Sequence, residues 1–82
     1  MIIKHPISTE KAIRLLNEEN KLIFIVDRKS KKNEIAIELE KMFDAKVEQI
    51  RTLIDRKGNK KAYVRFTAET PALDIATKLG LL

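Results

Sequence analysis

The chain has 82 residues, of which 44% are hydrophobic, 35% are charged and none is cysteine. A chain this short forms one domain with little spare core for a deep catalytic cleft, and without cysteine it holds neither disulfides nor thiolate metal sites. Seventeen lysines and arginines against twelve acidic residues give a net charge of +5, which favours a polyanionic partner.

The first third of the sequence predicts a short strand, a helix and a buried strand. Residues 2–3 form a strand that Pro6 ends, and Ser8 or Thr9 provides the N-cap of a helix that continues to about residue 17. Residues 21–27 read Lys-Leu-Ile-Phe-Ile-Val-Asp, which is β-rich and apolar on both faces, and is typical of an interior strand.

The remainder predicts a long helix, a hairpin and a final helix. Apolar residues recur at helical spacing over residues 30–43. Strands over residues 47–55 and 60–66 flank a four-residue connection containing Gly58, which is a hairpin signal. The last helix begins with Pro71 at its first position and ends at a glycine.

These elements predict an α+β fold with the order β-α-β-α-β-β-α, in a single domain over residues 1–82. The strands 21–27 and 47–55 flank a helix, and a right-handed crossover makes them parallel to each other. The hairpin strand 60–66 then lies between them, and the first strand lies on the outer side. The result is a mostly antiparallel four-stranded sheet, with order 1-2-4-3, packed with helices.

Two basic clusters, residues 28–32 and 56–61, follow the two parallel strands and hold eight of the seventeen cations. Because parallel strands end at one edge of a sheet, we expect the clusters side by side, where the long helix also directs its free amides. The opposite end carries Glu18, Glu19, Asp44, Glu69 and Asp74. Either cluster alone is an ordinary solvated turn, and their expected proximity is what favours contact with a phosphate backbone.

The open part of the predicted sheet could extend this surface. Arg51, Tyr63 and Arg65 lie on the strands of the hairpin, and Tyr63 is a candidate to stack on an unpaired base. A half-buried packing role is the more ordinary alternative for this tyrosine.

No catalytic or metal-binding pattern stands out. His5 is the only histidine, so we expect no metal or cofactor, and we assign it to terminus packing or to an RNA contact. The chain has no glycine-rich phosphate loop, and its carboxylate pairs are expected to be solvated. The longest apolar run, Leu22–Val26, cannot span a membrane, and the N-terminal residues have no signal-peptide hydrophobic region. We therefore expect a cytoplasmic protein that is neither an enzyme nor membrane-bound.

Four motifs in a fixed order resemble the twenty-third family of large-subunit ribosomal proteins, in its short archaeal-type form. The motifs are residues 4–12 (KHPISTEKA), 20–27 (NKLIFIVD), 43–53 (FDAKVEQIRTL) and 58–64 (GNKKAYV). The similarity continues to Gly80 and so covers essentially the whole chain.

The resemblance implies a structural constituent that binds large-subunit ribosomal RNA beside the mouth of the polypeptide exit tunnel. It also implies a neighbouring large-subunit ribosomal protein and a docking site for the signal recognition particle or other nascent-chain factors. The family's factor-docking acid aligns with Glu10, whose plain alternative is a first-turn helix carboxylate. We expect a monomer off the ribosome.

The family's RNA-contacting segments match residues 4–11, 28–33 and 51–61 here. Together with the open sheet, they give the following predicted RNA-binding residues: Lys4, His5, Lys11, Arg28, Lys29, Lys31, Lys32, Asn33, Arg51, Arg56, Lys57, Gly58, Lys60, Lys61, Tyr63 and Arg65.

Two features depart from the family pattern. The hairpin connection is too short for the extension by which bacterial members reach into the tunnel wall, so no tunnel-reaching role follows. The N-cap of the long helix, usually Ser or Thr, is Lys31. Either Ser30 caps the helix one residue early, or Lys31 gives up cap stability for a phosphate contact.

Two alternatives remain at this stage. A stand-alone RNA-recognition domain would place exposed aromatic residues on two central strands, whereas this chain offers Tyr63, with Phe24 and Phe66 expected in the core. A small-molecule regulatory or phosphatase-like domain would need a phosphate cradle or an apolar ligand cleft, and the sequence indicates neither.

Overall fold

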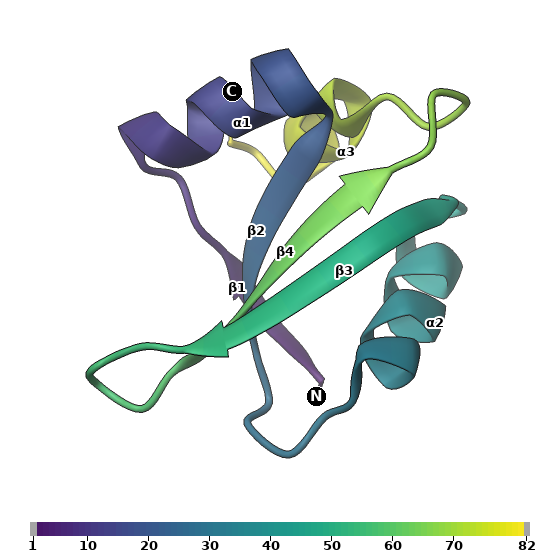
Figure 1. The fold of residues 1–82 in the computed structure, drawn as a ribbon. Helices are drawn as coiled ribbons and strands as arrows, with labels where there is room; N and C mark the ends of the chain where they lie inside the picture. The colour runs from purple at the N-terminus through teal and green to yellow at the C-terminus, as the bar shows by residue number, and fades with distance from the viewer. Residues whose placement is uncertain (1, 82) are drawn as a thin grey trace.

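Three helices pack against a four-stranded sheet in the computed structural model, which describes residues 2–81 (Figure 1). In chain order the elements are β1 Ile3–Pro6, α1 Glu10–Glu19, β2 Lys21–Val26, α2 Lys32–Phe43, β3 Val47–Ile54, β4 Lys60–Phe66 and α3 Ala72–Lys78. This order confirms the predicted α+β class and the β-α-β-α-β-β-α succession.

The sheet has the predicted strand order, β1-β2-β4-β3. β2 and β3 both pair antiparallel with β4, which lies between them, so they are parallel to each other and end at one edge of the sheet. β1 pairs antiparallel with β2 on the outer side. Each row of the sheet joins distant parts of the chain. Ala62, for example, lies between Phe24 and Thr52.

Alternation along β4 separates the two faces of the sheet. Val64 and Phe66 are buried beneath α2 and α3 with residues such as Leu39, whereas the intervening Tyr63 and Arg65 are only half-buried. α1 packs mainly on β2, which explains why β2 is buried on both faces. The second face of β3 and β4 carries no helix and faces the viewer in Figure 1.

α1 shows how local capping sets the ends of a helix. Thr9 rather than Ser8 is its N-cap, and the Thr9 hydroxyl accepts the Ala12 amide at 3.2 Å. The helix continues two residues beyond the predicted end, to Glu19, because Asn20 ends it in the left-handed conformation with φ of 56°. Asparagine tolerates that conformation better than most residues.

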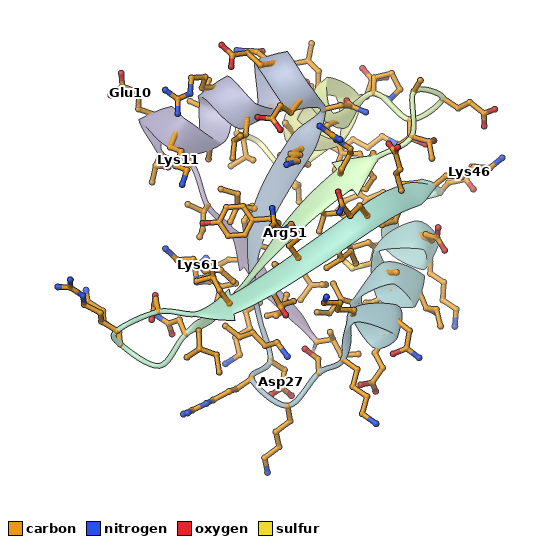
Figure 2. All side chains as sticks on the ribbon, in the orientation of Figure 1. Glu10, Lys11, Asp27, Lys46, Arg51 and Lys61 are labelled. Atoms are coloured by element: carbon orange, nitrogen blue, oxygen red, sulfur yellow. The ribbon has the colours of Figure 1, made fainter. Side chains whose placement is uncertain are left out.

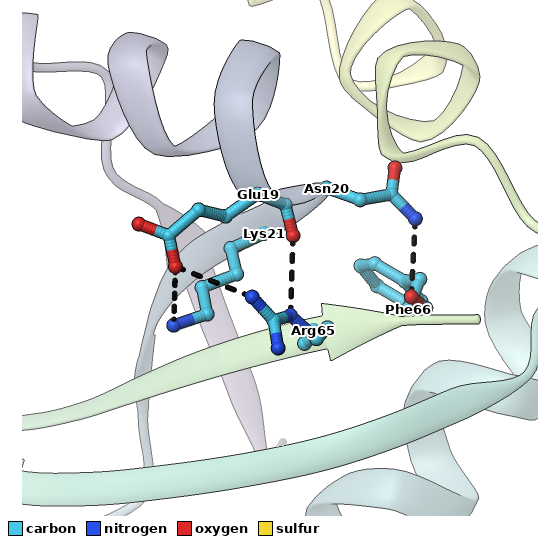
Figure 3. Close-up of polar contacts among 5 residues, drawn as sticks. All are labelled: Glu19, Asn20, Lys21, Arg65 and Phe66. Carbon is cyan, nitrogen blue, oxygen red and sulfur yellow. Dashed lines mark hydrogen bonds and ion pairs between the residues drawn. The ribbon is translucent and has the colours of Figure 1, made fainter. Parts of the chain in front are cut away.

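The side chain of Asn20 also ties together three segments that are distant in sequence. Its amide nitrogen donates to the carbonyls of Phe66, Thr67 and Thr70 at 3.1, 3.2 and 3.1 Å, and the first of these bonds is drawn in Figure 3. Its carbonyl oxygen accepts the Ala72 amide at 2.7 Å. Asn20 therefore holds the end of α1 against the end of β4 and the start of α3.

α3 begins one residue later than predicted. Pro71 lies at the N-cap with ψ of 120°, not at the first helical position, because Asn20 accepts the amide of Ala72 and fixes that residue as the first of the helix. The predicted glycine stop is confirmed, since Gly80 takes φ of 75°. Gly80 donates to the Thr77 carbonyl and Leu81 to the Ala76 carbonyl, which is the Schellman pattern.

Candidate nucleic-acid interface

The two predicted basic clusters meet at one edge of the sheet. The loop after β2 and the β3–β4 hairpin, which we call the basic edge (residues 27–32 and 55–61), contact each other through side chains. The Lys60 ammonium donates to the Ser30 carbonyl at 2.5 Å. A guanidinium nitrogen of Arg28 lies 3.7 Å from the position that a Cβ on Gly58 would take. The expected proximity of the clusters is thus confirmed.

The cations of the basic edge have no ion-pair partner in the described part of the chain. The ion pairs among residues 2–81 join Glu19 to Lys21, Glu19 to Arg65, and Lys46 to Glu69. All three lie away from the basic edge. Lys21 begins β2 and lies opposite Arg65, whereas β2 reaches the basic edge at Val26, and Lys46 lies well apart from Asp27 in Figure 2. The free cations of the basic edge are Arg28, Lys29, Lys31, Lys32, Arg56, Lys57 and Lys61, while Lys60 is engaged with a carbonyl.

Two carboxylates lie within the basic edge, and both bind backbone amides instead of side-chain cations. Asp27 accepts the Lys29 amide at 3.1 Å. Asp55 accepts the amides of Lys57 and Asn59, both at 2.9 Å. The hydrogen bond from the Asn59 backbone, followed by that from Lys57, lowers the pKa of Asp55 below its ordinary value. Sequence reasoning missed both residues, although the tripeptide Asp-Arg-Lys occurs at both places and could have been noticed.

The start of α2 settles the question of its N-cap. Lys31 is the N-cap residue and makes no side-chain capping bond, while Glu34 accepts the Lys31 amide at 2.8 Å. The alternative in which Ser30 caps the helix is wrong, because the buried Ser30 hydroxyl donates to the Asp27 carbonyl at 2.5 Å. The exposed Lys31 side chain is left free to face a ligand at the helix N-terminus.

The open face of the sheet adds an aromatic ring and further cations. Arg51 lies opposite Tyr63 in the sheet, and the Lys11 ammonium lies 5.8 Å from the centre of the tyrosine ring. Lys11 and Arg51 project on the same side of the sheet in Figure 2. Tyr63 is half-buried, as its packing role requires, yet it still lines a shallow hollow. The residues around this hollow are Lys11, Lys21, Arg51, Thr52, Leu53 and Tyr63.

Arg65 differs from the other predicted RNA-binding residues because its charge is already matched. Its guanidinium lies 3.3 Å from the Glu19 carboxylate and also donates to the Glu19 carbonyl, as Figure 3 shows. Lys21 lies 3.0 Å from the same carboxylate. The hydrogen bond and charge of Lys21, with a smaller contribution from Arg65, lower the pKa of Glu19.

The N-terminal segment supplies the remaining predicted residues. His5 lies opposite Ile25 on β1 and lines a shallow hollow together with Arg56, Lys57 and Lys61, so it joins the basic edge. Lys4 and Asn33 are exposed. Glu10 is exposed in the first turn of α1, and in Figure 2 it lies far from Asp27.

Other kinds of site find no support in the described residues. Within residues 2–81, no three His, Cys, Asp or Glu side chains are grouped closely enough to hold a metal ion. The helices of that same range are too short or too polar to cross a membrane.

The fold and this interface define a small α+β domain with one strongly cationic edge, a class suited to binding nucleic acid. Residues 1–76 match the family model for ribosomal protein L23. The large ribosomal subunit protein uL23 of Pyrobaculum aerophilum is 49% identical over 81 residues, which cover 99% of this chain and 100% of that relative. The chain belongs to the ribosomal protein L23 family.

Membership confirms the family predicted from the four motifs. The chain is a structural constituent of the large ribosomal subunit of the cytoplasmic ribosome, and it is not an enzyme. The stand-alone and regulatory-domain alternatives are set aside.

Proposed function

We propose that this chain binds large-subunit ribosomal RNA through the basic edge, near the mouth of the polypeptide exit tunnel. The observation that carries the proposal is the set of seven free cations that two distant loops bring together. The two acids within the basic edge, Asp27 and Asp55, bind backbone amides and form no ion pair with these cations in the described residues. The relative from Pyrobaculum aerophilum is by name a large-subunit protein, which agrees with this assignment.

The charges predict a strong salt dependence. Each phosphate contact contributes roughly −0.7 to −0.9 to the slope of log K against log salt, so seven contacts would give about −5 to −6. Lys11, Arg51 and Tyr63 on the open face extend the same surface and offer a ring for one unpaired base.

The test is a salt titration of binding to large-subunit ribosomal RNA in the presence of excess transfer RNA. Wild type is compared with a variant carrying Lys57→Gln, Lys60→Gln and Lys61→Gln. A matched control carries Lys41→Gln, Lys46→Gln and Lys78→Gln, which remove the same charge away from the basic edge. We expect competitor-resistant binding that falls, with a shallower slope, only in the first variant. Equal losses of RNA affinity in both triple variants would mean that the protein binds RNA only by non-specific charge attraction.

We further propose that Glu10 helps to dock the signal recognition particle or other nascent-chain factors, and that the domain lies beside a neighbouring large-subunit ribosomal protein. The exposure of Glu10, and its distance from the basic edge, would leave it accessible when that edge meets RNA. The test is binding of the signal recognition particle to subunits reconstituted with a Glu10→Lys variant. Glu18→Lys, at the other end of α1, is the matched control. Unchanged binding with Glu10→Lys would remove this role.

A further inference from the structure

The two loops of the basic edge contain the same tripeptide in the same turn. Residues 27–29 and 55–57 both read Asp-Arg-Lys. In the first turn the Asp27 carbonyl accepts the Ser30 amide at 3.0 Å, and in the second the Asp55 carbonyl accepts the Gly58 amide at 3.1 Å. Each is therefore a hydrogen-bonded four-residue turn that begins at its aspartate.

The side chains of the two aspartates also make the same bond. Each carboxylate accepts the amide of the lysine two residues later, at 3.1 Å from Asp27 and at 2.9 Å from Asp55. Such bonds fix the backbone of the turn locally. The two turns thus present an arginine at the second position and a lysine at the third from equivalent backbones.

The placement of these carboxylates calls for an explanation. A carboxylate repels a phosphate bound beside it. An acid in the middle of a cationic surface therefore weakens phosphate binding unless it also makes a favourable contribution, such as holding the cations in place. Among the described residues neither aspartate forms an ion pair. Both carboxylates accept backbone amides of their turns. Arg28, Lys29 and Arg56 therefore have no ion pair within the described residues that would compete with RNA phosphates.

The two turns also touch each other. The Arg28 guanidinium lies against Gly58, and Lys60 donates to the carbonyl of Ser30, the last residue of the first turn. Fixing one turn therefore helps to fix the other, and pre-ordered cations lose less conformational freedom when they bind.

We propose that the turns at residues 27–30 and 55–58 form one composite site for phosphate groups of an RNA backbone, in which Asp27 and Asp55 are positioning residues. The inference rests on the proposed function and deepens it, because it assigns the contact to a matched pair of turns and not to diffuse charge. It gives two negatively charged residues a favourable role in binding a polyanion.

Four variants test the proposal against simple electrostatics: Asp27→Ala, Asp55→Ala, Asp27→Asn and Asp55→Asn. All four remove one negative charge. Asparagine still offers a side-chain oxygen to the turn amide, whereas alanine does not. If charge alone matters, alanine and asparagine variants bind large-subunit ribosomal RNA more tightly than wild type, and equally so.

If the aspartates position the turns, the alanine variants bind more weakly and the asparagine variants bind at least as tightly as wild type. Loss of one phosphate contact lowers the slope by about 0.7 to 0.9, which is roughly a five- to eightfold loss at 0.1 M salt relative to 1 M. Thermal unfolding of each variant, measured alone, separates this effect from loss of the fold, and the asparagine variants provide the rescue.

Any result in which the alanine and asparagine variants of one turn behave alike overturns the proposal for that turn. Failure of the proposed function has a different signature, since wild type would then lose its RNA to the transfer RNA competitor. The two failures are thus distinguished in the same titration.

Discussion

The two ends of the sheet use their carboxylates in opposite ways. At the acidic end, Glu19 binds Lys21 and Arg65, so positive side chains are neutralised within the chain. At the basic edge, Asp27 and Asp55 bind backbone amides, and the cations beside them stay free. Net charge alone would not reveal this difference. A surface prepared for a charged partner is thus marked by charges that the fold leaves unmatched.

Substitutions at the acidic end should change the free energy of unfolding, because its polar groups are satisfied within the fold. Substitutions of cations at the basic edge should change RNA binding and its salt dependence, with little effect on stability.

The largest effect is expected at Asn20, in the acidic half. Asn20→Ala removes four hydrogen bonds and leaves a left-handed residue without its favourable side chain. At about 0.5–1.5 kcal/mol net per bond, we expect a loss of roughly 3 kcal/mol. Urea denaturation measures it. Asn20→Gly, which keeps the backbone but not the bonds, should recover about 1 kcal/mol. A loss below about 1 kcal/mol in Asn20→Ala would mean that these bonds do not hold the three segments.

Arg56 and Arg65 allow the same substitution to be made at each end of the sheet. Arg56→Gln and Arg65→Gln remove the same charge, one from the basic edge and one from the acidic end. Arg56 has no ion-pair partner in residues 2–81, whereas Arg65 is bound by Glu19. We expect Arg56→Gln to lower the RNA salt slope by about 0.7 to 0.9 and Arg65→Gln to lower it less. Equal changes would show that Arg65 leaves Glu19 to contact RNA, as its place on the open sheet face suggested.

Lys31 tests whether the basic edge gives up stability for charge. Threonine is a far better N-cap than lysine, so Lys31→Thr should stabilise the free protein by about 1 kcal/mol. The same change removes a free cation at the start of α2 and should weaken RNA binding severalfold. Thermal unfolding and RNA titration are measured on the same preparations. A stabilised variant with unchanged RNA affinity would contradict the hypothesis that Lys31 contacts phosphate.

The topology was predictable from the sequence because it rests on local signals. The hairpin around Gly58 and the right-handed crossover between β2 and β3 allow few arrangements, and these place both clusters at one edge. The helix boundaries were less predictable, since Ser30 bonds to Asp27 instead of capping α2, and Asn20 fixes the first residue of α3. The hydrogen-bond partners of the Asn20 side chain lie 46 to 52 residues away in the sequence, so no local pattern reveals them.

In the predicted interface, too, local features could be predicted and tertiary features could not. The free cations of both clusters were recognisable as a run of charge in the sequence. The neutralisation of Arg65 could not be recognised in this way, because Glu19 is distant in sequence and meets Arg65 only when α1 ends beside β4. Burial and pairing are tertiary properties, so a list of basic residues overstates the number that remain free for a partner.

The smallest expected effect is on the pH and salt dependence of stability, which should differ between Glu19 at the acidic end and Asp55 at the basic edge. Glu19 and Asp55 both have a pKa below the ordinary value for their type. A depressed pKa in the folded state means that the unfolded chain binds the proton more readily. Each group therefore stabilises the fold above its unfolded pKa, near 4.5 for Glu19 and 3.8 for Asp55, and this contribution is lost as the pH falls through the folded pKa.

The causes of the two shifts predict different responses to salt. At Glu19 the hydrogen bond and the charge of Lys21 come first and the charge of Arg65 adds to them, so every partner is a cation at a partly exposed site, where salt screens the attraction. At Asp55 the hydrogen bonds come mainly from uncharged backbone amides, so salt should weaken them less. We expect Glu19→Gln to reduce the loss of stability on acidification at low salt, and to reduce it less at 1 M salt. Asp55→Asn should reduce this loss to a similar extent at both salt concentrations. Urea midpoints between about pH 2.5 and 6 measure the loss. If salt erased both contributions alike, Asp55 would also act through charge, and the contrast between the two ends of the sheet would lose its physical basis.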